Sequence, residues 1–298
     1  MPDFGCTSMT EPLRRVLVRA PSAAAASTWR EYGWRGEPDF STLAAEHEAF
    51  CELLEGAGAE VVVANGLDED PDAIYAFDPC LVTEHGAIVM RPGKEGRRVE
   101  AAAIETDLEG LGIPVAGRVS APDLAEGGDF IRLDEGTMLA GRGYRTSAGG
   151  IAEIARVLPG LETIAFDLPH WRGEAEVMHL LSLLSPLDAD LVVAYPPLMP
   201  VALVELLRVR GIEIVPVPDE EFESMGTNIL ALAPRVGLAL DGNPATRRRL
   251  EAAGVEVLVY RGRELSLKGD GGPTCLTMPF LRSAGRPATA GEARLRPA

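Results

Sequence analysis

A repeated pattern runs through the chain, in which a helix-like stretch of apolar and polar positions ends in a glycine and leads into an apolar strand. It occurs five times, as LLEGAGAEVVV, LEGLGIPVAG, VLPGLETIAF, LRVRGIEIVPV and LEAAGVEVLVY. The glycines are expected to close the helices in the left-handed conformation; they are Gly58, Gly112, Gly160, Gly211 and Gly254. Their spacing of roughly 40 to 55 residues is typical of propeller and solenoid repeats.

The first of these stretches, STLAAEHEAFCELLEGAG, predicts an amphipathic helix whose apolar face contains Leu43, Ala44, Phe50, Leu53 and Leu54. Between the helices lie apolar pairs that are joined by turn residues. These read as hairpins, in CLVTEHGAIVM, DFIRLDEGTMLAG, DLVVAYPPLMP and NILALAPRVGLAL. Each unit is therefore predicted to be hairpin, helix and strand.

Five such units predict an α/β fold closed into a ring, a five-bladed propeller with pseudo-fivefold symmetry. An open doubly wound sheet is less favoured, because it would alternate single strands with helices and this chain keeps inserting hairpins. No G-x-G-x-x-G follows the first strand, VLVRAP, so a dinucleotide site has little support. One domain is expected over residues 1–285, with an irregular loop at 21–40 and a flexible tail at 286–298.

The net charge of the chain limits the classes of molecule that it is expected to bind. The 298 residues include 28 Lys+Arg and 45 Asp+Glu, for a formal charge of −17. Nucleic-acid binding is not expected, because it requires a cluster of basic residues on one face. The excess of acidic residues mildly favours a small cationic substrate. The N-terminus lacks the apolar core of a secretion signal and no apolar run approaches a membrane span, so a cytoplasmic protein without a membrane partner is expected.

Cys275 and His179 are the two candidates for nucleophilic and proton-transfer chemistry. Cys275 follows a Gly/Asp-rich segment at the mouth of an apolar strand, where a thiol can be both exposed and held; the alternative is a buried structural cysteine. His179 lies among apolar residues, and the alternative is a core histidine with its hydrogen bonds satisfied. The other cysteines and histidines are interpreted as structural or solvated: Cys6, Cys51, Cys80, His47, His85 and His170.

Acidic residues stand just before predicted strands. Glu126 and Asp129 belong to an EGGD turn, and Asp72 and Asp78 belong to DPDAIYAFDPCLV. The alternative is that these acidic residues only stabilise the turns before the strands, where such residues are common. Together, carboxylates at strand ends suit a delocalised cation, because a guanidinium offers planar N–H donors to paired oxygens. A neighbouring thiolate could attack its central carbon.

Six motifs in order resemble the guanidino-modifying superfamily, and in particular its dimethylarginine dimethylaminohydrolase branch. They are D-x5-D-P, EGGD, GRGYRTS, HL followed by PLDADLVV, GTNILAL and GDGGPTC, spread over residues 16–282. The resemblance implies a five-bladed α/β propeller with the site in its central channel, which agrees with the five repeats.

For catalysis, the resemblance implies that Cys275 is the nucleophile, His179 the general acid and base, and Glu126 the partner that orients the histidine. The implied reaction is hydrolysis of a C–N bond of N-methylated arginine through a covalent thiouronium intermediate, giving citrulline and methylamine or dimethylamine. It needs no cofactor and no metal.

For binding, the resemblance implies that Asp78 holds the guanidinium and Asp72 the α-amino group of the substrate. It implies that Arg97 and Arg145 bind the α-carboxylate, although a shift of one residue would exchange Arg97 for Arg98. The expected partner is thus a small cationic guanidino compound, and a homodimer is left open.

Three positions depart from the family pattern. Leu181 stands where arginine deiminases and amidinotransferases have an aspartate, which argues against both activities. Phe77 stands where the dimethylarginine hydrolases commonly have a glutamate, and Gly269 replaces a larger side chain, so a reshaped substrate pocket is expected.

Three alternative functions remain. They are amidinotransfer, a deiminase-like hydrolysis of another guanidino compound, and a non-catalytic binding propeller. Residues 21–40 lie where relatives place a mobile lid, with Trp29 and Trp34 as shields against water or as simple packing residues.

Overall fold

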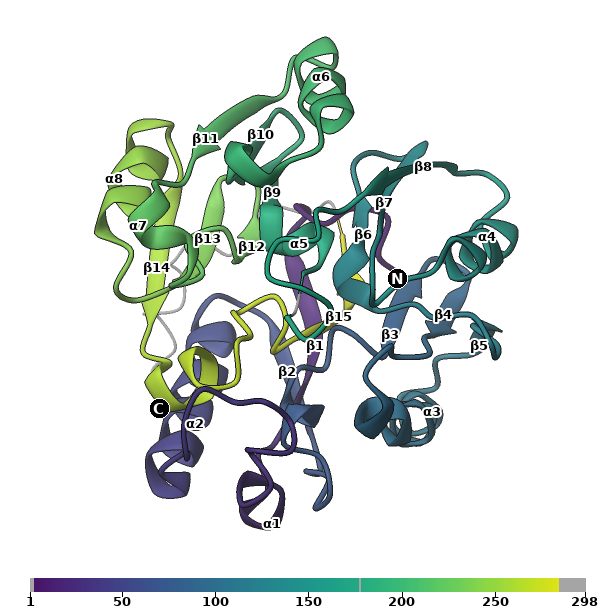
Figure 1. Ribbon diagram of the computed structural model, residues 1–298, viewed down its shortest axis with the longest axis vertical. Coiled ribbons are helices and arrows are strands. Elements are labelled where there is room, and N and C mark those ends of the chain that lie inside the picture. Colours follow the sequence, from purple (N-terminus) through teal and green to yellow (C-terminus); the bar gives the residue numbers. More distant parts are fainter. Residues whose placement is uncertain (1–2, 177, 284–298) are drawn as a thin grey trace, which may run out of the picture.

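The computed structural model describes residues 3–176 and 178–283, which form five three-stranded sheets arranged around a central axis (Figure 1). The first sheet joins β15 (Met278–Arg282), β1 (Leu13–Arg19) and β2 (Glu60–Ala64). The second and third contain β3 (Cys80–Thr83), β4 (Gly86–Val89) and β5 (Val115–Arg118), then β6 (Phe130–Arg132), β7 (Thr137–Arg142) and β8 (Glu162–Asp167). The last two contain β9 (Leu184–Asp188), β10 (Leu191–Ala194) and β11 (Glu213–Pro216), then β12 (Ile229–Ala233), β13 (Val236–Leu240) and β14 (Glu256–Tyr260).

Every sheet has the same internal order: the first two strands pair antiparallel and the last two pair parallel. A parallel pair needs a crossover, and a helix on the outside of each sheet supplies it. These helices are α2 (Phe40–Gly56), α3 (Glu100–Gly110), α4 (Ala148–Val157), α6 (Val201–Val209) and α8 (Pro244–Ala252). The strands β15 and β1, from opposite ends of the chain, pair in the first sheet and close the ring.

Short helical segments occupy the connections between these elements. They are α1 (Ala23–Ala26), α5 (Leu180–Leu183) and α7 (Asp219–Phe222), together with the 3₁₀ segments η1 (Pro71–Ile74), η2 (Glu95–Val99), η3 (Gly127–Asp129) and η4 (Pro196–Leu198) and the π-helical turn η5 (Arg263–Leu267). Three of them, η2, η3 and α5, lie beside the site described below.

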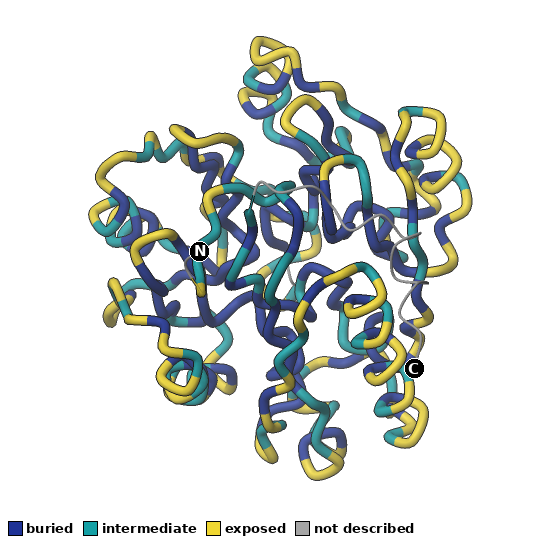
Figure 2. The backbone as a smooth tube through the Cα atoms, turned by 180° about the vertical axis from the view of Figure 1, so that it is seen from behind, coloured by how far each residue is buried: buried dark blue, intermediate teal, exposed yellow. Residues whose placement is uncertain are grey.

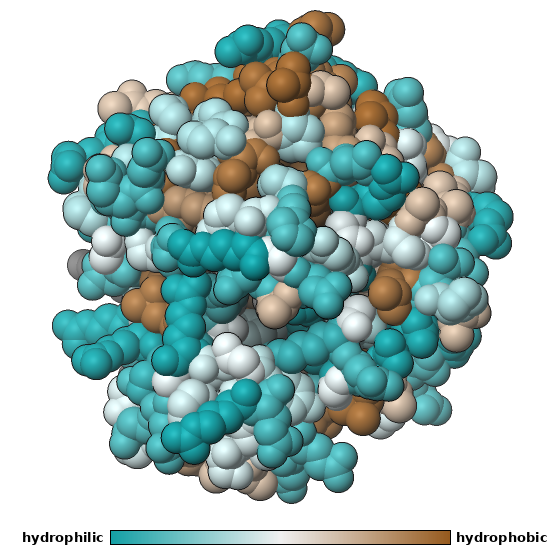
Figure 3. All heavy atoms as spheres, viewed as in Figure 1, coloured by the Kyte–Doolittle hydropathy of each residue, from teal (hydrophilic) through white to brown (hydrophobic). Residues whose placement is uncertain are grey.

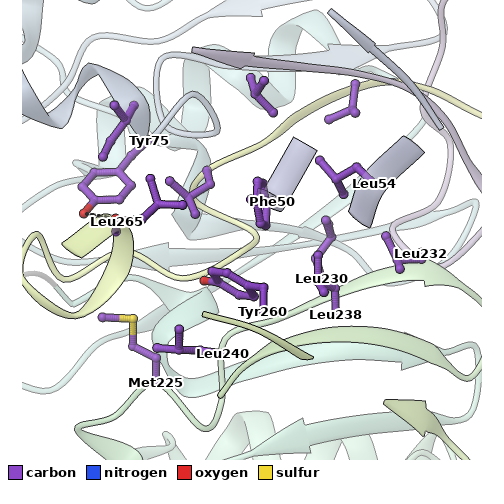
Figure 4. Packing of buried hydrophobic residues seen from close by; sticks show 14 of the residues in the cluster. Phe50, Leu54, Tyr75, Met225, Leu230, Leu232, Leu238, Leu240, Tyr260 and Leu265 are labelled. Carbon is purple, nitrogen blue, oxygen red and sulfur yellow. Dashed lines mark hydrogen bonds between the residues drawn. The ribbon is translucent and has the colours of Figure 1, made fainter. Parts of the chain in front are cut away.

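The crossover helix α2 shows why the repeats fold as they do. The Asp39 carboxylate caps its first turn by accepting the Thr42 N–H at 2.7 Å. Phe50 and Leu54 are fully buried, and the Phe50 ring meets Tyr260 of β14 edge-on at 5.0 Å (Figure 4). Burial of this apolar stripe therefore fixes α2 against both the first and the last blade.

The first strand of each antiparallel pair lies nearest the axis. A cavity of about 50 Å³ on the axis is lined largely by β3, β6, β9, β12 and β15. Figure 2 agrees, since the buried backbone gathers at the centre and the exposed backbone lies mainly in the outer helices and loops. Segments that enter these inner strands are thus brought together at the centre of the ring.

The five-bladed α/β propeller predicted from the repeats is confirmed, with two local corrections. The hairpin expected in DLVVAYPPLMP is wrong, because β10 instead pairs with the preceding β9, and a 3₁₀ turn that begins at Pro196 follows it. The expectation for Gly160 is also wrong: α4 already ends at Val157, because Pro159 cannot continue it. The other four glycines do adopt positive φ; they are Gly58, Gly112, Gly211 and Gly254.

The loop expected at 21–40 contains the single helical turn α1 but is otherwise irregular, as predicted. The predicted tail at 286–298 lies outside the described residues.

Among the residues that are described, no helix has both the length and the apolar composition needed to cross a bilayer. On the face shown in Figure 3, apolar side chains gather toward the top, over α6, and hydrophilic ones surround the centre.

Candidate active site

Five side chains meet because each one lies in the segment that enters an inner strand. Asp78 precedes β3, Glu126 precedes β6, His179 precedes β9, Asn228 precedes β12 and Cys275 precedes β15. The pseudo-fivefold arrangement therefore gathers residues that are almost 200 positions apart in the sequence. All three residues predicted to act in catalysis are among them.

His179 and Glu126 form a short hydrogen bond. The distance from His179 Nε2 to Glu126 Oε2 is 2.6 Å, and both side chains are buried. Burial opposes the positive charge on the imidazole, but the nearby carboxylates, Asp78 first, outweigh it and raise the pKa of His179 to about 9. At neutral pH the pair is therefore an imidazolium facing a carboxylate.

Glu126 is held in place by more than the histidine. Its Oε1 accepts the Gly93 N–H at 2.8 Å and lies 3.2 Å from Arg145 Nη1. Burial by itself would raise the pKa of Glu126, but the hydrogen bond from His179 and the charge of Arg145 hold that pKa well below its usual range. Glu126 is thus a fixed anion that orients His179.

Cys275 lines the same cavity as His179 and is held by Asn228. Asn228 Nδ2 donates to the Cys275 sulfur at 3.2 Å, and Asn228 Oδ1 accepts the Thr274 N–H at 3.1 Å, so one amide fixes both the thiol and its backbone. Burial, reinforced by Asp78, raises the pKa of the Cys275 thiol to about 12. Without a cation beside it, this cysteine is a neutral thiol at physiological pH.

Asp78 faces His179 on one side and a buried arginine on the other. Its Oδ1 accepts the Gly128 N–H at 3.2 Å and lies 3.9 Å from His179 Nδ1, and its Oδ2 accepts from Arg97 Nη1 at 2.7 Å. Gly128 is required by this close approach, because a Cβ there would lie 2.5 Å from His179 Nδ1.

Arg97 does not present a free guanidinium to the site. It is buried, and Glu100 accepts two of its N–H groups, from Nε at 2.5 Å and from Nη2 at 3.0 Å. The Tyr75 carbonyl accepts another. Its role as a carboxylate ligand stays a prediction that would require exchange of these partners. Arg98 is more exposed and pairs with Glu95, at 3.3 Å.

Two adjoining cavities give access to these groups. A smaller one of about 70 Å³ is lined by Cys275, His179 and Asn228, with an apolar wall that includes Trp171 and Phe222. A larger one of about 630 Å³ is lined by charged residues, among them Asp72, Lys94 and Arg145. Arg35 and Asp270 line both cavities, so Cys275 lies beside a polar vestibule, a name used below for the larger cavity.

The segment at 21–40 covers part of this vestibule. Trp34 is buried, and its Nε1 donates to Asp72 Oδ1 at 2.7 Å. Trp34 and Tyr75 also explain Gly269, because a Cβ there would lie 2.8 Å from the indole and 2.0 Å from the phenol oxygen. The space at Gly269 is therefore filled by aromatic rings, and the reshaped substrate pocket expected from this position stays a prediction.

Phe77, the second departure from the family pattern, is buried and lines the axial cavity, not the cavity beside Cys275.

Two residues of the site were not predicted from the sequence. They are Asn228, although it lies in the GTNILAL motif, and Lys94. Asp129 of EGGD accepts the Leu180 N–H at 2.9 Å directly after His179, and burial raises the pKa of Asp129 to about 7.

A metal could in principle use three of these side chains, since ligand atoms of Asp78, Glu126 and His179 lie within 4.8 Å of one another. Arg97 and Arg145 already neutralise the two carboxylates, however, so the cluster is explained as the hydrogen-bonded support of His179.

Comparison with known proteins agrees with this geometry. A family model described as "Arginine deiminase" matches residues 67–213 and 199–282. A dimethylarginine dimethylaminohydrolase of Streptomyces coelicolor is 30% identical over 268 residues, which cover 90% of this chain and 97% of the relative. A protein of the same name from Pseudomonas aeruginosa is 27% identical over 82% of this chain and 91% of its own. An arginine deiminase of Mycobacterium marinum is 35% identical, over 53% of this chain and 46% of the relative.

Solved structures share the fold. The Pseudomonas aeruginosa dimethylarginine dimethylaminohydrolase, a cysteine-to-serine mutant complexed with citrulline, superimposes with a TM-score of 0.76 at 24% identity, covering 90% of this chain and all of that one. The N-terminal domain of a cyanobacterial arginine dihydrolase, bound to its product, gives 0.79 at 19% identity, over 91% and 98% of the two chains.

The five-bladed ring, with a thiol facing a histidine–carboxylate pair at its centre, defines a protein of the guanidino-modifying class. The chain belongs to the arginine deiminase family, and within it to the dimethylarginine dimethylaminohydrolase branch.

Proposed function

We propose that the protein hydrolyses the C–N bond of N-methylated arginine, with Cys275 as nucleophile, and releases citrulline and methylamine or dimethylamine. The observation that carries the proposal is that Cys275 and His179 line the same cavity, while Glu126 forms a hydrogen bond with the imidazole. The names of the two bacterial dimethylarginine dimethylaminohydrolases give it further support.

The protonation states of the free site fit a substrate-activated thiol. Cys275 is neutral because its pKa is raised to about 12, and His179 is protonated because its pKa is raised to about 9. A guanidinium placed beside the sulfur brings a positive charge that lowers the thiol pKa. The thiolate then forms only when the substrate is present: its proton passes to solvent, because His179 is already protonated, and Asn228 stabilises the anion by donating to the sulfur.

The first half of the reaction forms a C–S bond and breaks a C–N bond. The Cys275 thiolate attacks the guanidinium carbon, and the protonated His179 donates its proton to the departing amine. The remaining amidino group stays attached to the sulfur as a thiouronium. Glu126 and Asp78 stabilise the imidazolium before the transfer, and Glu126 keeps the ring oriented afterwards.

The second half returns the enzyme to its starting state. Neutral His179 takes a proton from a water molecule as the water oxygen bonds to the thiouronium carbon. Collapse of this adduct breaks the C–S bond, and the remaining hydroxyl proton passes to the departing sulfur, which leaves a ureido C=O, a neutral Cys275 thiol and a protonated His179. If an amine entered instead of water, the same site would transfer the amidino group, which is the amidinotransferase alternative.

Recognition of the amino-acid end is proposed to use the charged vestibule. Asp72 is the proposed partner of the α-ammonium group, and Arg145 is a proposed partner of the α-carboxylate. Both side chains line the large cavity beside Cys275. Asp78 is proposed to hold the guanidinium with its Oδ1, which its own pair with Arg97 leaves facing His179.

Mass spectrometry of products tests this proposal. The purified protein, with a Cys275→Ala variant beside it, is incubated with methylated arginines, with arginine, and with glycine as an added acceptor. Citrulline and a methylamine, both absent with the variant, are the expected products. Citrulline and ammonia from arginine alone would indicate a deiminase, and an amidinated glycine would indicate a transferase. No turnover of any compound would favour a non-catalytic binding propeller.

A cytoplasmic location is also proposed, because all four cysteines are free thiols within the described residues. Sedimentation of the purified protein would test the homodimer that the sequence leaves open.

A further inference from the structure

Lys94 is a cation of the vestibule that the proposed mechanism does not use. It lines the large cavity together with Asp72 and Arg145. Its backbone position is fixed, because the preceding residue, Gly93, donates its N–H to the catalytic Glu126 at 2.8 Å. A side chain at position 94 is therefore held at a constant place relative to the reacting groups.

The Lys94 ammonium forms an ion pair at the wall of the cavity. Its Nζ lies 2.5 Å from Asp72 Oδ2 and 2.5 Å from the Tyr32 carbonyl oxygen, and it stands over the Tyr32 ring, 4.7 Å from its centre. The Lys94 side chain is 23% exposed and that of Asp72 is 8% exposed. The vestibule thus presents a cation and an anion side by side, which is the charge pattern that complements an amino-acid zwitterion.

The two arginines of the site already have carboxylate partners within the protein, so Lys94 would share the α-carboxylate with Arg145. Arg97 is buried, with its N–H groups on Asp78, Glu100 and a backbone carbonyl. Arg145 donates to Glu126, and its side chain is only 9% exposed. Lys94 keeps one of its three ammonium hydrogens free of the contacts described above, so it can accept a new anion with the least rearrangement.

We propose that Lys94 binds the α-carboxylate of the substrate while Asp72 binds its α-ammonium, so that the zwitterion inserts into the existing ion pair. The inference rests on the proposed function, and it specifies the substrate class as free α-amino acids that carry a guanidino group. A guanidino amine without a carboxylate is disfavoured, because its ammonium would compete with Lys94 for Asp72 and would bring no anion to Lys94 in exchange.

The test compares Lys94→Met and Lys94→Arg with the parent protein on two substrates, N-methylarginine and its decarboxylated analogue, N-methylagmatine. With the amino acid, Lys94→Met is expected to raise KM by roughly 10- to 100-fold, as loss of a charged hydrogen bond does, with little change in kcat. With the amine, the same variant is expected to leave KM unchanged or to lower it. Lys94→Arg is expected to recover most of the amino-acid preference.

Arg118→Met is the matched control, since Arg118 forms an exposed ion pair with Glu105 remote from the cavities. If Lys94→Met raises KM equally for both substrates, Lys94 only fastens the 21–40 segment through Tyr32 and the proposal is overturned. Unchanged KM with both substrates overturns it as well. If the parent protein turns over neither compound, the proposed function fails first, and the two failures are thereby distinguished.

Discussion

Replacing Glu126 by Gln removes a charge from the catalytic pair while keeping its shape. The amide oxygen of Gln can still accept the Gly93 N–H, so the local backbone should be retained. The hydrogen bond from His179 to Glu126 is 2.6 Å long and buried, and such a bond to a charged group contributes about 1.5–3 kcal/mol. Since one pKa unit corresponds to about 1.36 kcal/mol, its loss should lower the pKa of His179 by about one to two units.

The sign of the effect on activity follows from the role of His179 as an acid. In the parent protein, activity should decline on the alkaline side near pH 9, where His179 loses the proton that the departing amine requires. In Glu126→Gln, this alkaline limb should move down to about pH 7–8, and kcat should fall by roughly 10²–10⁴-fold because proton transfer is less well oriented.

The assay is the pH profile of kcat for methylarginine, measured by citrulline formation between pH 6 and 10. Glu105→Gln serves as the control, because Glu105 pairs with Arg118 on the surface. The reasoning is refuted if Glu126→Gln lowers kcat but leaves the alkaline limb near pH 9, since Glu126 would then not set the charge state of His179.

Three further predictions concern the thiol, a glycine and the core. Because the pKa of Cys275 is raised to about 12, the free protein should show no thiolate absorbance from this residue at pH 7 in a difference spectrum against Cys275→Ser, and a clear thiolate signal at neutral pH would contradict this. Gly128→Ala should abolish turnover while the circular dichroism stays native, because the added Cβ lies 2.5 Å from His179 Nδ1 and 3.1 Å from Asp78 Oδ1; full activity would show that the ring can move freely. Phe50→Ala removes a fully buried ring and should lower the free energy of unfolding by about 3–5 kcal/mol in a urea titration, whereas a loss below about 1 kcal/mol would show that the site collapses to fill the gap.

Much of the fold could be predicted because the repeats are local. Four of the five helix-closing glycines adopt the expected positive φ, since a helix that must turn directly into a strand favours a residue without a Cβ at that point. The hairpin at DLVVAYPPLMP was mispredicted because the true partner of β10 is LSPLD, whose proline at 186 conceals a strand. Periodicity could not reveal that β15 and β1 share a sheet, because that pairing depends on ring closure.

The candidate catalytic residues Cys275, His179 and Glu126 were predicted from family motifs, and the ring explains why they lie close together. Asn228 and Lys94 were missed for a different reason: their place in the site is visible only from contacts with other segments of the chain, with Cys275 and Asp72 respectively. Arg97 has the expected residue type, but Glu100, three residues later, already binds its guanidinium. The spacing of residues along the sequence does not show whether a charged side chain will pair with the substrate or with another side chain of the protein.

Intact-protein mass spectrometry after acid quenching during turnover tests the covalent mechanism most directly. With N,N-dimethylarginine, the account predicts a single adduct equal to the substrate less dimethylamine, located by peptide mapping on Cys275 and absent from Cys275→Ala. Citrulline formation with no adduct on any cysteine, or full turnover by Cys275→Ala, would contradict the account.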